Sequence, residues 1–412
     1  MKKIFPGNVL LLGAFLFSTL ICSQSAVERN YLRKFIHPLQ SYDADTGFKE
    51  DSLVFNRFFA NVKIIGLGEA SHGSSEIFKL KDKLTRYILM KNNGGVFSIE
   101  SPMPKAMLIN EYIVNGKKTG KEYVMNLDSW IYQTDEILDM TEWMKKYNDR
   151  HASKITFTGF DMTTYRGSVV QFKIIMDKYN VSTDHLMKLT QLLHEENQLE
   201  KKQLSRKKQI HAEASTELDH IRNFLPNISG PDDYSWFAQH LVLLEQYIHR
   251  SYLDRNRYMA ENIAWLKNKY PESAFVLWAH NEHLKKTGAE TGRFLIEKFK
   301  DDYTSCGTFF YEGSHSVIGL DDKKITPAFV KKNTPDSLEE LLNSFNIPIF
   351  ILDLKSIKKE NNELTKVLLK KINYRTVGAS PTSNDFKSGN ITDDFDYLIF
   401  IKNSTASKLL SN

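Results

Sequence analysis

The 412-residue sequence has little cysteine, and only its first residues contain a long apolar run. Two cysteines, Cys22 and Cys306, cannot supply the disulfide framework that stabilises many small exported domains, so stability must come from an apolar core. Cys306 lies in an apolar stretch and is expected to be a small buried hydrophobe. No basic stripe with interleaved aromatic residues is present, which argues against a nucleic-acid partner.

Several catalytic signatures are also absent. The chain has no GxSxG nucleophile elbow and no HExxH zinc motif, and no repeat of fixed period is visible. These absences favour water activated by a side chain over a serine nucleophile. The composition, 41% hydrophobic and 25% charged, is typical of a globular protein.

The first 25 residues have the pattern of a secretory signal peptide. Two lysines precede an apolar run over residues 9–22, and small polar residues follow before Ala26. The run is shorter than the ~20 residues of a membrane span, so no stable membrane insertion is expected. Cys22 raises a lipoprotein alternative, but Ile21 is a poor residue before a lipidated cysteine. We therefore favour export to the periplasm with cleavage before Ala26.

Short β-branched and aromatic runs alternate with helix-like segments, which predicts an α/β fold with a central, mostly parallel sheet flanked by helices. The predicted strands are 63–67, 96–100, 155–161, 274–280, 304–312, 349–354 and 396–402. Helices are predicted over 75–92, with Ser74 or Ser75 as N-cap, and over 135–148. The segment 377–392 is loop-like.

Residues 183–270 differ from the rest because they are charged, amphipathic and poor in glycine. Two long helical segments, 183–224 and 234–270, are expected to pair around the turn 225–231. This helical insertion is predicted to form a second lobe over the active-site cleft. Residues 26–412, insertion included, are expected to be one catalytic domain.

Ionisable residues follow four of the predicted strands. Glu69 and His72 follow the first, and Glu100, Asp161 and His280 end the next three. In open α/β sheets the ligand site lies at the carboxyl ends of the strands. The sequence therefore predicts one shared site at this edge of the sheet.

The stretch GLGEASHGSSE, residues 66–76, supplies the candidate general base. An imidazole takes a proton from water near neutral pH, and a neighbouring carboxylate orients it, so His72 and Glu69 suit these roles. Glu100 suits water positioning or acid–base work. The plainer interpretations are a helix cap for the turn and a structural salt bridge for Glu100.

WAHNEH, residues 278–283, places His280 and His283 three residues apart at a strand end, with Asn281 as an amide donor. Two histidines and two glutamates also suit a zinc site, so a metal is possible but not required. Further candidates surround this cluster. Lys81 or Arg86 can serve as an oxyanion or carboxylate partner. Asp161 can anchor a histidine or arginine. Trp130 can form an apolar wall together with Tyr132, Trp143 and Trp278.

Taken together, these motifs resemble the erythromycin esterase family. The resemblance runs in order over residues 60–310 and includes 66–88, 97–101, 130–144, 157–162, 255–266 and 276–284. It implies a carboxylic ester hydrolase that opens the lactone of macrolide antibiotics without metal or other cofactor, and so gives antibiotic resistance. It further implies His72 as base, Glu69 and Glu100 as its carboxylate partners, and His280 and His283 as the remaining catalytic histidines.

Two positions depart from the family pattern. Lys81 stands near a position where relatives often carry arginine, and Arg255-Asn256 replaces an Arg-Asp pair. Two other functions stay open on the sequence alone: a metal-dependent hydrolase of another substrate that uses the same cluster, and a non-enzymatic carrier of a hydrophobic ligand. The sequence indicates neither the oligomeric state nor the macrolides accepted.

Overall fold

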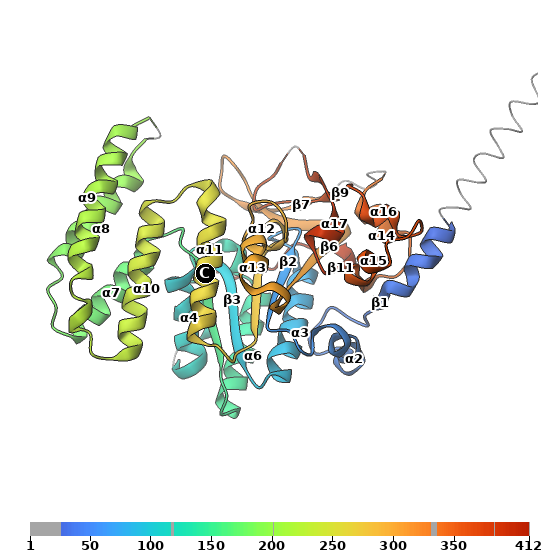
Figure 1. Ribbon diagram of the computed structural model, residues 1–412, viewed down its shortest axis with the longest axis horizontal. Helices are drawn as coiled ribbons and strands as arrows, with labels where there is room; N and C mark the ends of the chain where they lie inside the picture. Colours follow the sequence, from blue (N-terminus) through green and yellow to red (C-terminus); the bar gives the residue numbers. More distant parts are fainter. Residues whose placement is uncertain (1–25, 117–118, 201, 331–335, 383, 412) are drawn as a thin grey trace, which may run out of the picture.

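The chain forms a central twisted sheet with helices on both faces (Figure 1). The structure is a computed structural model, and it describes residues 26–116, 119–200, 202–330, 336–382 and 384–411. The predicted signal peptide therefore lies outside the described residues. The main sheet has the strand order β1-β8-β11-β6-β2-β5-β3-β4, with β7 paired to β6. Its strands are β1 (Ile36–Pro38), β2 (Ile64–Glu69), β3 (Gly95–Pro102), β4 (Ile155–Asp161), β5 (Phe275–His280), β6 (Tyr303–Ile318), β7 (Ile325–Phe329), β8 (Ile349–Asp353) and β11 (Tyr397–Ser404).

The predicted fold class is confirmed, because in the main sheet the contiguous strands from β11 to β4 run parallel, whereas β1, β7 and β8 are joined to it by antiparallel pairing. One face of the sheet is covered by α2 (Phe48–Phe59), α3 (Ser75–Lys91), α4 (Met103–Asn115) and α6 (Asp135–Arg150). The other face is covered by α11 (Tyr252–Lys269), α12 (Asn281–Leu284) and α13 (Thr291–Phe299). Because both faces are covered, the central strands read as unbroken apolar runs.

Strand β5 shows this directly, since all six of its residues are buried. Val276 and Trp278 pack toward α3, whereas Phe275, Leu277 and Ala279 pack toward α11 and α13. The alternation follows from the period of two along a strand. Full burial of one such large side chain contributes about 1.5–3 kcal/mol.

The helical insertion differs from the prediction in its number of helices. It contains α8 (Asp184–Gln198), α9 (Leu204–Arg222), α10 (Pro231–Ile248) and α11, so the predicted segments 183–224 and 234–270 are each divided in two. Helices α9 and α10 pack against each other around the turn 225–231, as predicted, and α9 packs more extensively against α8. Together with α7 (Arg166–Lys178), α8 to α10 form a lobe with its own apolar core at one end of the molecule (Figure 1). Helix α11 returns to the sheet.

The remaining elements are short. They are α5 (Gly120–Val124), α14 (Leu338–Asn343), α15 (Leu354–Glu360), α16 (Lys366–Leu369) and α17 (Ile391–Asp394), with the hairpin β9 (Ile372–Arg375) and β10 (Phe386–Gly389) and the 3-10 turns η1 (Arg33–Phe35), η2 (Trp130–Tyr132), η3 (Leu225–Asn227) and η4 (Lys300–Asp302). The prediction of a loop over 377–392 is thus wrong in part, because β10 and the start of α17 lie within it. Among the described residues, no helix has the length and apolarity needed to cross a bilayer.

Residues beyond β11 bind the loop that carries His72. The backbone N–H of Ser75 donates to the carbonyl of Thr405 (3.0 Å), and the N–H of Ser407 donates to the carbonyl of Gly73 (2.8 Å). The buried Glu76 carboxylate accepts from the N–H of Thr405 (2.6 Å) and from its hydroxyl (2.8 Å). We refer to residues 405–410 as the terminal clasp.

We expect Glu76→Ala to lower the free energy of unfolding by about 2–3 kcal/mol, because two hydrogen bonds to a buried carboxylate are lost and the Thr405 N–H is left unpaired. Urea unfolding of the two proteins measures the difference. Asp177→Ala is a suitable control, since it removes an exposed pair with Lys173 within one helix, worth about 0.3–0.5 kcal/mol. A loss for Glu76→Ala no larger than that of the control would contradict the role of the clasp.

Candidate active site

The candidate base lies at the end of β2. Imidazole Nδ1 of His72 lies 3.0 Å from Oε1 of the fully buried Glu69. Because the carboxylate accepts, Nδ1 carries the proton and Nε2 has a free lone pair. No described residue bonds Nε2, and 11% of the His72 side chain is exposed.

Local sequence explains why the loop adopts this geometry. Ser74 is the N-cap of α3, as predicted, and its hydroxyl accepts from the N–H of Ile77 (3.3 Å). Gly73 lies directly against β6, where an added Cβ would come within 2.3 Å of the Ser316 carbonyl oxygen. Only glycine permits this approach. The turn between Glu69 and Ser74 is therefore fixed at both ends.

Lys81 completes the first half of the site, which His72 and Glu69 begin. Its fully buried ammonium pairs with Oε2 of Glu69 and lies 4.5 Å from the ring centroid of Trp278. Burial alone would raise the pKa of Glu69, but Lys81 and His72 together hold this pKa below its usual value. Glu69 is therefore ionised and can stabilise a protonated His72.

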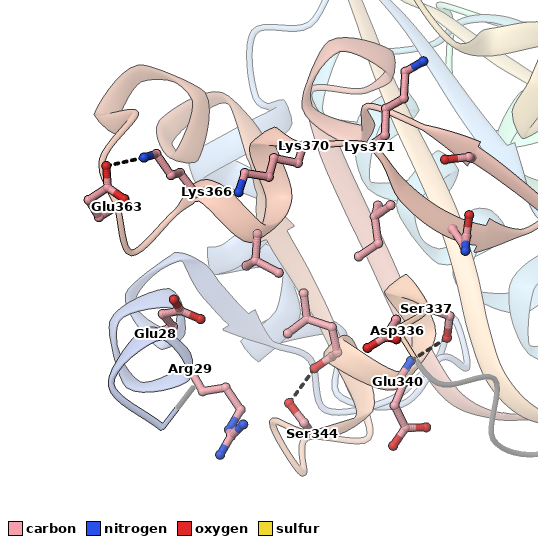
Figure 2. A pocket seen from close by; sticks show the side chains of 15 residues that line it. Glu28, Arg29, Asp336, Ser337, Glu340, Ser344, Glu363, Lys366, Lys370 and Lys371 are labelled. Carbon is pink, nitrogen blue, oxygen red and sulfur yellow. Dashed lines mark hydrogen bonds and ion pairs between the residues drawn. The ribbon is translucent and has the colours of Figure 1, made fainter. Parts of the chain in front are cut away.

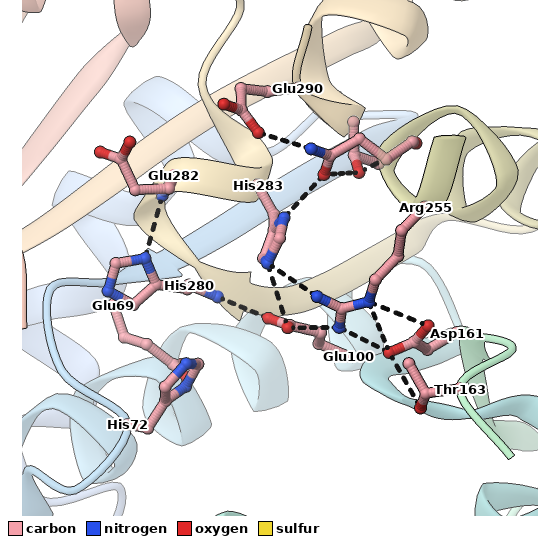
Figure 3. A network of polar contacts seen from close by, with 12 residues as sticks. Glu69, His72, Glu100, Asp161, Thr163, Arg255, His280, Glu282, His283 and Glu290 are labelled. Atoms are coloured by element: carbon pink, nitrogen blue, oxygen red, sulfur yellow. Dashed lines mark hydrogen bonds and ion pairs between the residues drawn. The ribbon is translucent and has the colours of Figure 1, made fainter. Parts of the chain in front are cut away.

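Glu100, at the end of β3, is the centre of the second half (Figure 3). Its Oε1 accepts from Arg255 Nη2 (2.8 Å) and lies 3.2 Å from His283 Nε2, while Oε2 accepts from the backbone N–H of His280 (3.1 Å). Burial opposes ionisation of Glu100, but the neighbouring His283 and Arg255 lower its pKa well below the usual range. Glu100 thus forms the salt bridge considered from the sequence, at the same edge of the sheet as His280, and its part in acid–base chemistry stays a prediction.

Asp161, at the end of β4, holds the other side of Arg255. The guanidinium donates to Asp161 through Nη2 (2.6 Å) and Nε (3.2 Å), so it is clamped between two carboxylates from adjacent strands. Arg255 comes from α11, more than 90 residues further along the chain. Sequence reasoning expected Asp161 to anchor a histidine or arginine but did not assign Arg255 to the site, although Arg255 stands in the segment 255–266 and in the pair Arg255-Asn256.

His283 is placed to be an imidazolium. Its Nδ1 lies 2.7 Å from Oδ1 of Asn256, whose amide nitrogen donates to Glu290 (2.7 Å). Asn256 Oδ1 can only accept, so Nδ1–H donates to it and Nε2 faces Glu100. Although burial lowers the pKa of His283, Glu100 raises it above the usual value. Asn256 therefore orients His283 without adding a negative charge beside it.

His280 is neutral and held by the backbone. Its Nδ1 accepts from the N–H of Glu282 (3.2 Å), which leaves Nε2–H to donate to the carbonyl of Val377 (3.3 Å). Burial and the nearby His72 and His283 lower the pKa of His280 to about 4. Its ring centroid lies 5.0 Å from that of His72. His280 thus forms a wall beside the candidate base.

The other predicted residues lie outside this cluster. Arg86 binds Asp82 on its own helix (2.7 Å and 2.9 Å) and packs over Trp143. Asn281, the first residue of α12, exchanges two hydrogen bonds with the backbone of Thr308 and so joins α12 to β6. Trp130 is half-buried in η2, and Trp278 and Tyr132 are core residues, not the walls of an apolar cleft.

A cavity of about 410 Å³ opens next to the cluster. It is lined by Glu100, Pro102, Asp128, Ser129, Ile131, Asp161, Thr163, Thr164, Arg166 and Arg255. Hydroxyls and charges dominate this lining. A larger cavity of about 920 Å³, between α14, α16 and the first described helical residues, shares no lining residue with the cluster (Figure 2). Among the described residues, no group of three or more His, Cys, Asp or Glu side chains converges as metal ligands.

Comparison with known proteins decides the family. A model described as erythromycin esterase matches residues 95–404. The chain belongs to the erythromycin esterase family. As a member of this family it is a hydrolase.

Two relatives of this erythromycin esterase family member are 23% and 25% identical to it. YbfO of Bacillus subtilis, which is named as a hydrolase, is 23% identical over 85% of this chain and 88% of YbfO. Erythromycin esterase type II of Escherichia coli is 25% identical over 69% of this chain and 76% of that enzyme. Among solved structures, a succinoglycan biosynthesis protein has a TM-score of 0.77 at 22% identity, covering 94% of this chain and 99% of its own. An open conformation of a His-to-Asn mutant of the erythromycin esterase EreC has a TM-score of 0.70 at 15% identity, covering 92% and 100%.

We expect Glu100→Gln to lower the pKa of His283, because the carboxylate that stabilises the imidazolium is removed. The ion pair stabilises the wild-type fold fully below the unfolded histidine pKa near 6.5, and this contribution is lost as pH rises through the higher folded pKa. Titration of the His283 ring carbon by NMR, assigned with His283→Gln, measures the shift. Glu217→Gln, which removes the partner of His185 in the helical lobe, should leave the His283 midpoint unchanged. An unshifted midpoint in Glu100→Gln would contradict the assignment.

Proposed function

We propose that this hydrolase opens the lactone ester of erythromycin-type macrolides with a water molecule activated by His72. The observation that carries the proposal is the Nδ1–H bond from His72 to the buried, ionised Glu69, which leaves Nε2 as a free base at the sheet edge. An oriented imidazole with a carboxylate behind it is an effective general base near neutral pH.

The proposed reaction balances in two steps. Water gives a proton to His72 Nε2 as its oxygen bonds to the lactone carbonyl carbon, and a tetrahedral oxyanion forms. The C–O bond of the lactone then breaks, and the imidazolium returns the proton to the leaving alkoxide. The product is a linear hydroxy acid that contains one added water, and Glu69 stabilises the imidazolium between the two steps.

Glu100, Asp161, Arg255 and His283 form the polar surface on which the ester group is held. Arg255 and His283 bring positive charge close to the developing oxyanion, and the two carboxylates fix their positions. Fixed cationic donors stabilise a transition state without reorganising during the reaction. An ester needs less of this stabilisation than an amide.

Two features support a macrolide as substrate. The Escherichia coli relative is named as an erythromycin esterase, and the cavity beside Arg255 has the hydroxyls and charges that suit a sugar-bearing molecule better than an apolar one. Cleavage of the signal peptide before Ala26 and export to the periplasm would place the enzyme where it meets an entering antibiotic. Resistance to the antibiotic is the expected consequence.

Mass spectrometry of erythromycin incubated with the purified protein tests the proposal. We expect a product heavier by one water, formed with or without a chelator. His72→Ala should reduce the rate by about 10²- to 10⁴-fold, because the general base is lost, while macrolide binding persists. His185→Ala, in the helical lobe, is the matched control and should keep full activity.

Other outcomes would contradict parts of the proposal. Activity that the chelator abolishes would favour a metal-dependent hydrolase. Equal loss of turnover and binding in His72→Ala would point to a ligand-binding protein. Failure to hydrolyse any macrolide, with turnover of other esters, would make the substrate assignment wrong and leave the role of His72 intact.

A further inference from the structure

Helix α13 begins with two polar residues that bind the same asparagine. Glu290 occupies the N-cap position, but its side chain makes no capping bond, and its Oε2 accepts from Nδ2 of Asn256 on α11 (2.7 Å). The hydroxyl of the fully buried Thr291 lies 3.0 Å from Asn256 Oδ1 and 3.1 Å from the Asn256 carbonyl oxygen. Figure 3 shows Glu290 joined to His283 through this asparagine. The start of α13 is therefore bonded to Asn256 by two side chains.

The carboxylate of Glu290 decides which way the Asn256 amide points. Nδ2–H of the amide donates to this carboxylate, so Oδ1 accepts from Thr291 and from Nδ1–H of His283 (2.7 Å). The opposite orientation would place Oδ1 against a carboxylate oxygen, and two acceptors cannot bond each other. Thr291 alone would not exclude that orientation, because a hydroxyl both donates and accepts. Glu290 therefore fixes the amide, and Thr291 supports it.

The orientation of this amide in turn decides whether His283 can carry a positive charge. An imidazolium has two N–H groups, and both are donors. Here Nδ1–H donates to Asn256 Oδ1, and Nε2–H faces Oε1 of Glu100 (3.2 Å). With the amide reversed, its NH2 group would face Nδ1, and a proton on Nδ1 would meet another donor. His283 would then be held neutral, with its proton on Nε2.

The surroundings of Nε2 suit both protonation states of His283. A protonated Nε2 donates to Glu100, and the lone pair of a deprotonated Nε2 can accept from Nη1 of Arg255 (3.4 Å). The ring needs no rotation between the two states. Burial and Arg255 lower the pKa of His283, whereas Glu100 and Glu290 raise it. The proton of His283 is therefore gained and lost at the nitrogen between Glu100 and Arg255, and not at Nδ1.

We propose that Glu290 and Thr291 are positioning residues of the active site, which through the Asn256 amide keep Nδ1 of His283 protonated and Nε2 directed at Glu100. This inference rests on the proposed ester hydrolysis, in which the cationic form of His283 stabilises the oxyanion. Neither residue lines the cavity of the site, so both act through Asn256 and not by touching the substrate. A site histidine held in the wrong tautomer can lower kcat by as much as about 10⁴-fold.

Glu290→Gln tests the orientation of the amide without changing the size of the side chain. A glutamine amide both donates and accepts, so either orientation of Asn256 becomes possible. We expect the Nε2–H form of neutral His283 to appear and kcat to fall by about 10- to 100-fold, the usual cost of removing a group that orients a site histidine. The double variant Glu290→Gln/Asn256→Asp should restore the Nδ1–H form and raise kcat again, because the new carboxylate accepts both from the glutamine and from Nδ1–H.

Thr291 offers a matched pair of variants. Thr291→Val keeps the shape of the side chain and removes its donor, whereas Thr291→Ser keeps the hydroxyl. We expect Thr291→Val to lower kcat by about fivefold, the factor that corresponds to one neutral hydrogen bond, and Thr291→Ser to stay near the wild type. Glu217→Gln removes the carboxylate partner of His185 in the helical lobe and is the control, which should leave His283 and kcat unchanged.

The test uses the purified protein labelled with ¹⁵N-histidine, with erythromycin and p-nitrophenyl acetate as substrates. Long-range ¹H–¹⁵N spectra, assigned with His283→Gln and recorded at alkaline pH where the ring is neutral, show which nitrogen carries the proton. An Nδ1–H form in the wild type that becomes mixed in Glu290→Gln, together with the loss of kcat, and returns in the double variant supports the proposal.

Three results would overturn it. They are a neutral wild-type His283 with its proton on Nε2, a tautomer that Glu290→Gln leaves unchanged, and a changed tautomer with kcat within twofold of wild type. If the wild type hydrolyses neither ester, the proposed function fails, and the tautomers of the wild type, of Glu290→Gln and of the double variant still decide the role of Glu290.

Discussion

The buried ion pair between Glu69 and Lys81 is the constraint on which the site depends. Both side chains are fully buried, and a charge in such a place is tolerated only when an opposite charge and further hydrogen bonds compensate it. Lys81 must therefore project from α3 toward the end of β2, with the face of Trp278 beneath it. His72 completes the compensation on the other carboxylate oxygen, which fixes its tautomer. The arrangement of base, carboxylate and ammonium follows from one electrostatic requirement.

A second set of buried charges, each with an opposite charge as partner, lies beside the Glu69–Lys81 pair. Glu100 and Asp161 end neighbouring parallel strands, and a single arginine from α11 lies between them. The two acids bring the arginine to the sheet edge, and the arginine allows both acids to stay ionised in a buried position. The helical insertion therefore contributes to the site through α11, whereas α8 and α9 pack against each other and against α10.

The strand ends could be predicted because acids and histidines interrupt apolar runs at Glu69, Glu100, Asp161 and His280, and parallel strands bring such ends to one edge. Helical phase could also have separated Lys81 from Arg86. Lys81 lies on the stripe formed by Ile77, Leu84 and Ile88, which faces the sheet, whereas Arg86 is turned toward α6. A lysine buried on such a stripe must form an ion pair, because a buried ammonium without an opposite charge is costly.

Other features depend on long-range contacts that no local pattern contains. Arg255 has an unremarkable helical context, and its role comes from two carboxylates about 90 or more residues earlier in the chain. The breaks between α8 and α9 and between α10 and α11 lie in polar sequence that amphipathic spacing does not resolve. Trp278 and Tyr132 were expected to line a cleft because aromatic residues suit both cores and pockets, and only packing distinguishes the two.

The terminal clasp also determines when the site can assemble. Gly73, Ser75 and Gln133 receive backbone partners from residues 405–410, so the loop of His72 and the turn of Tyr132 obtain their native anchors from sequence that the ribosome makes more than 270 residues later. A nascent chain that already contains every candidate catalytic residue still lacks these anchors. The loop of His72 and the turn η2 therefore depend on contacts of very long sequence separation, whose formation carries a large loop-closure entropy.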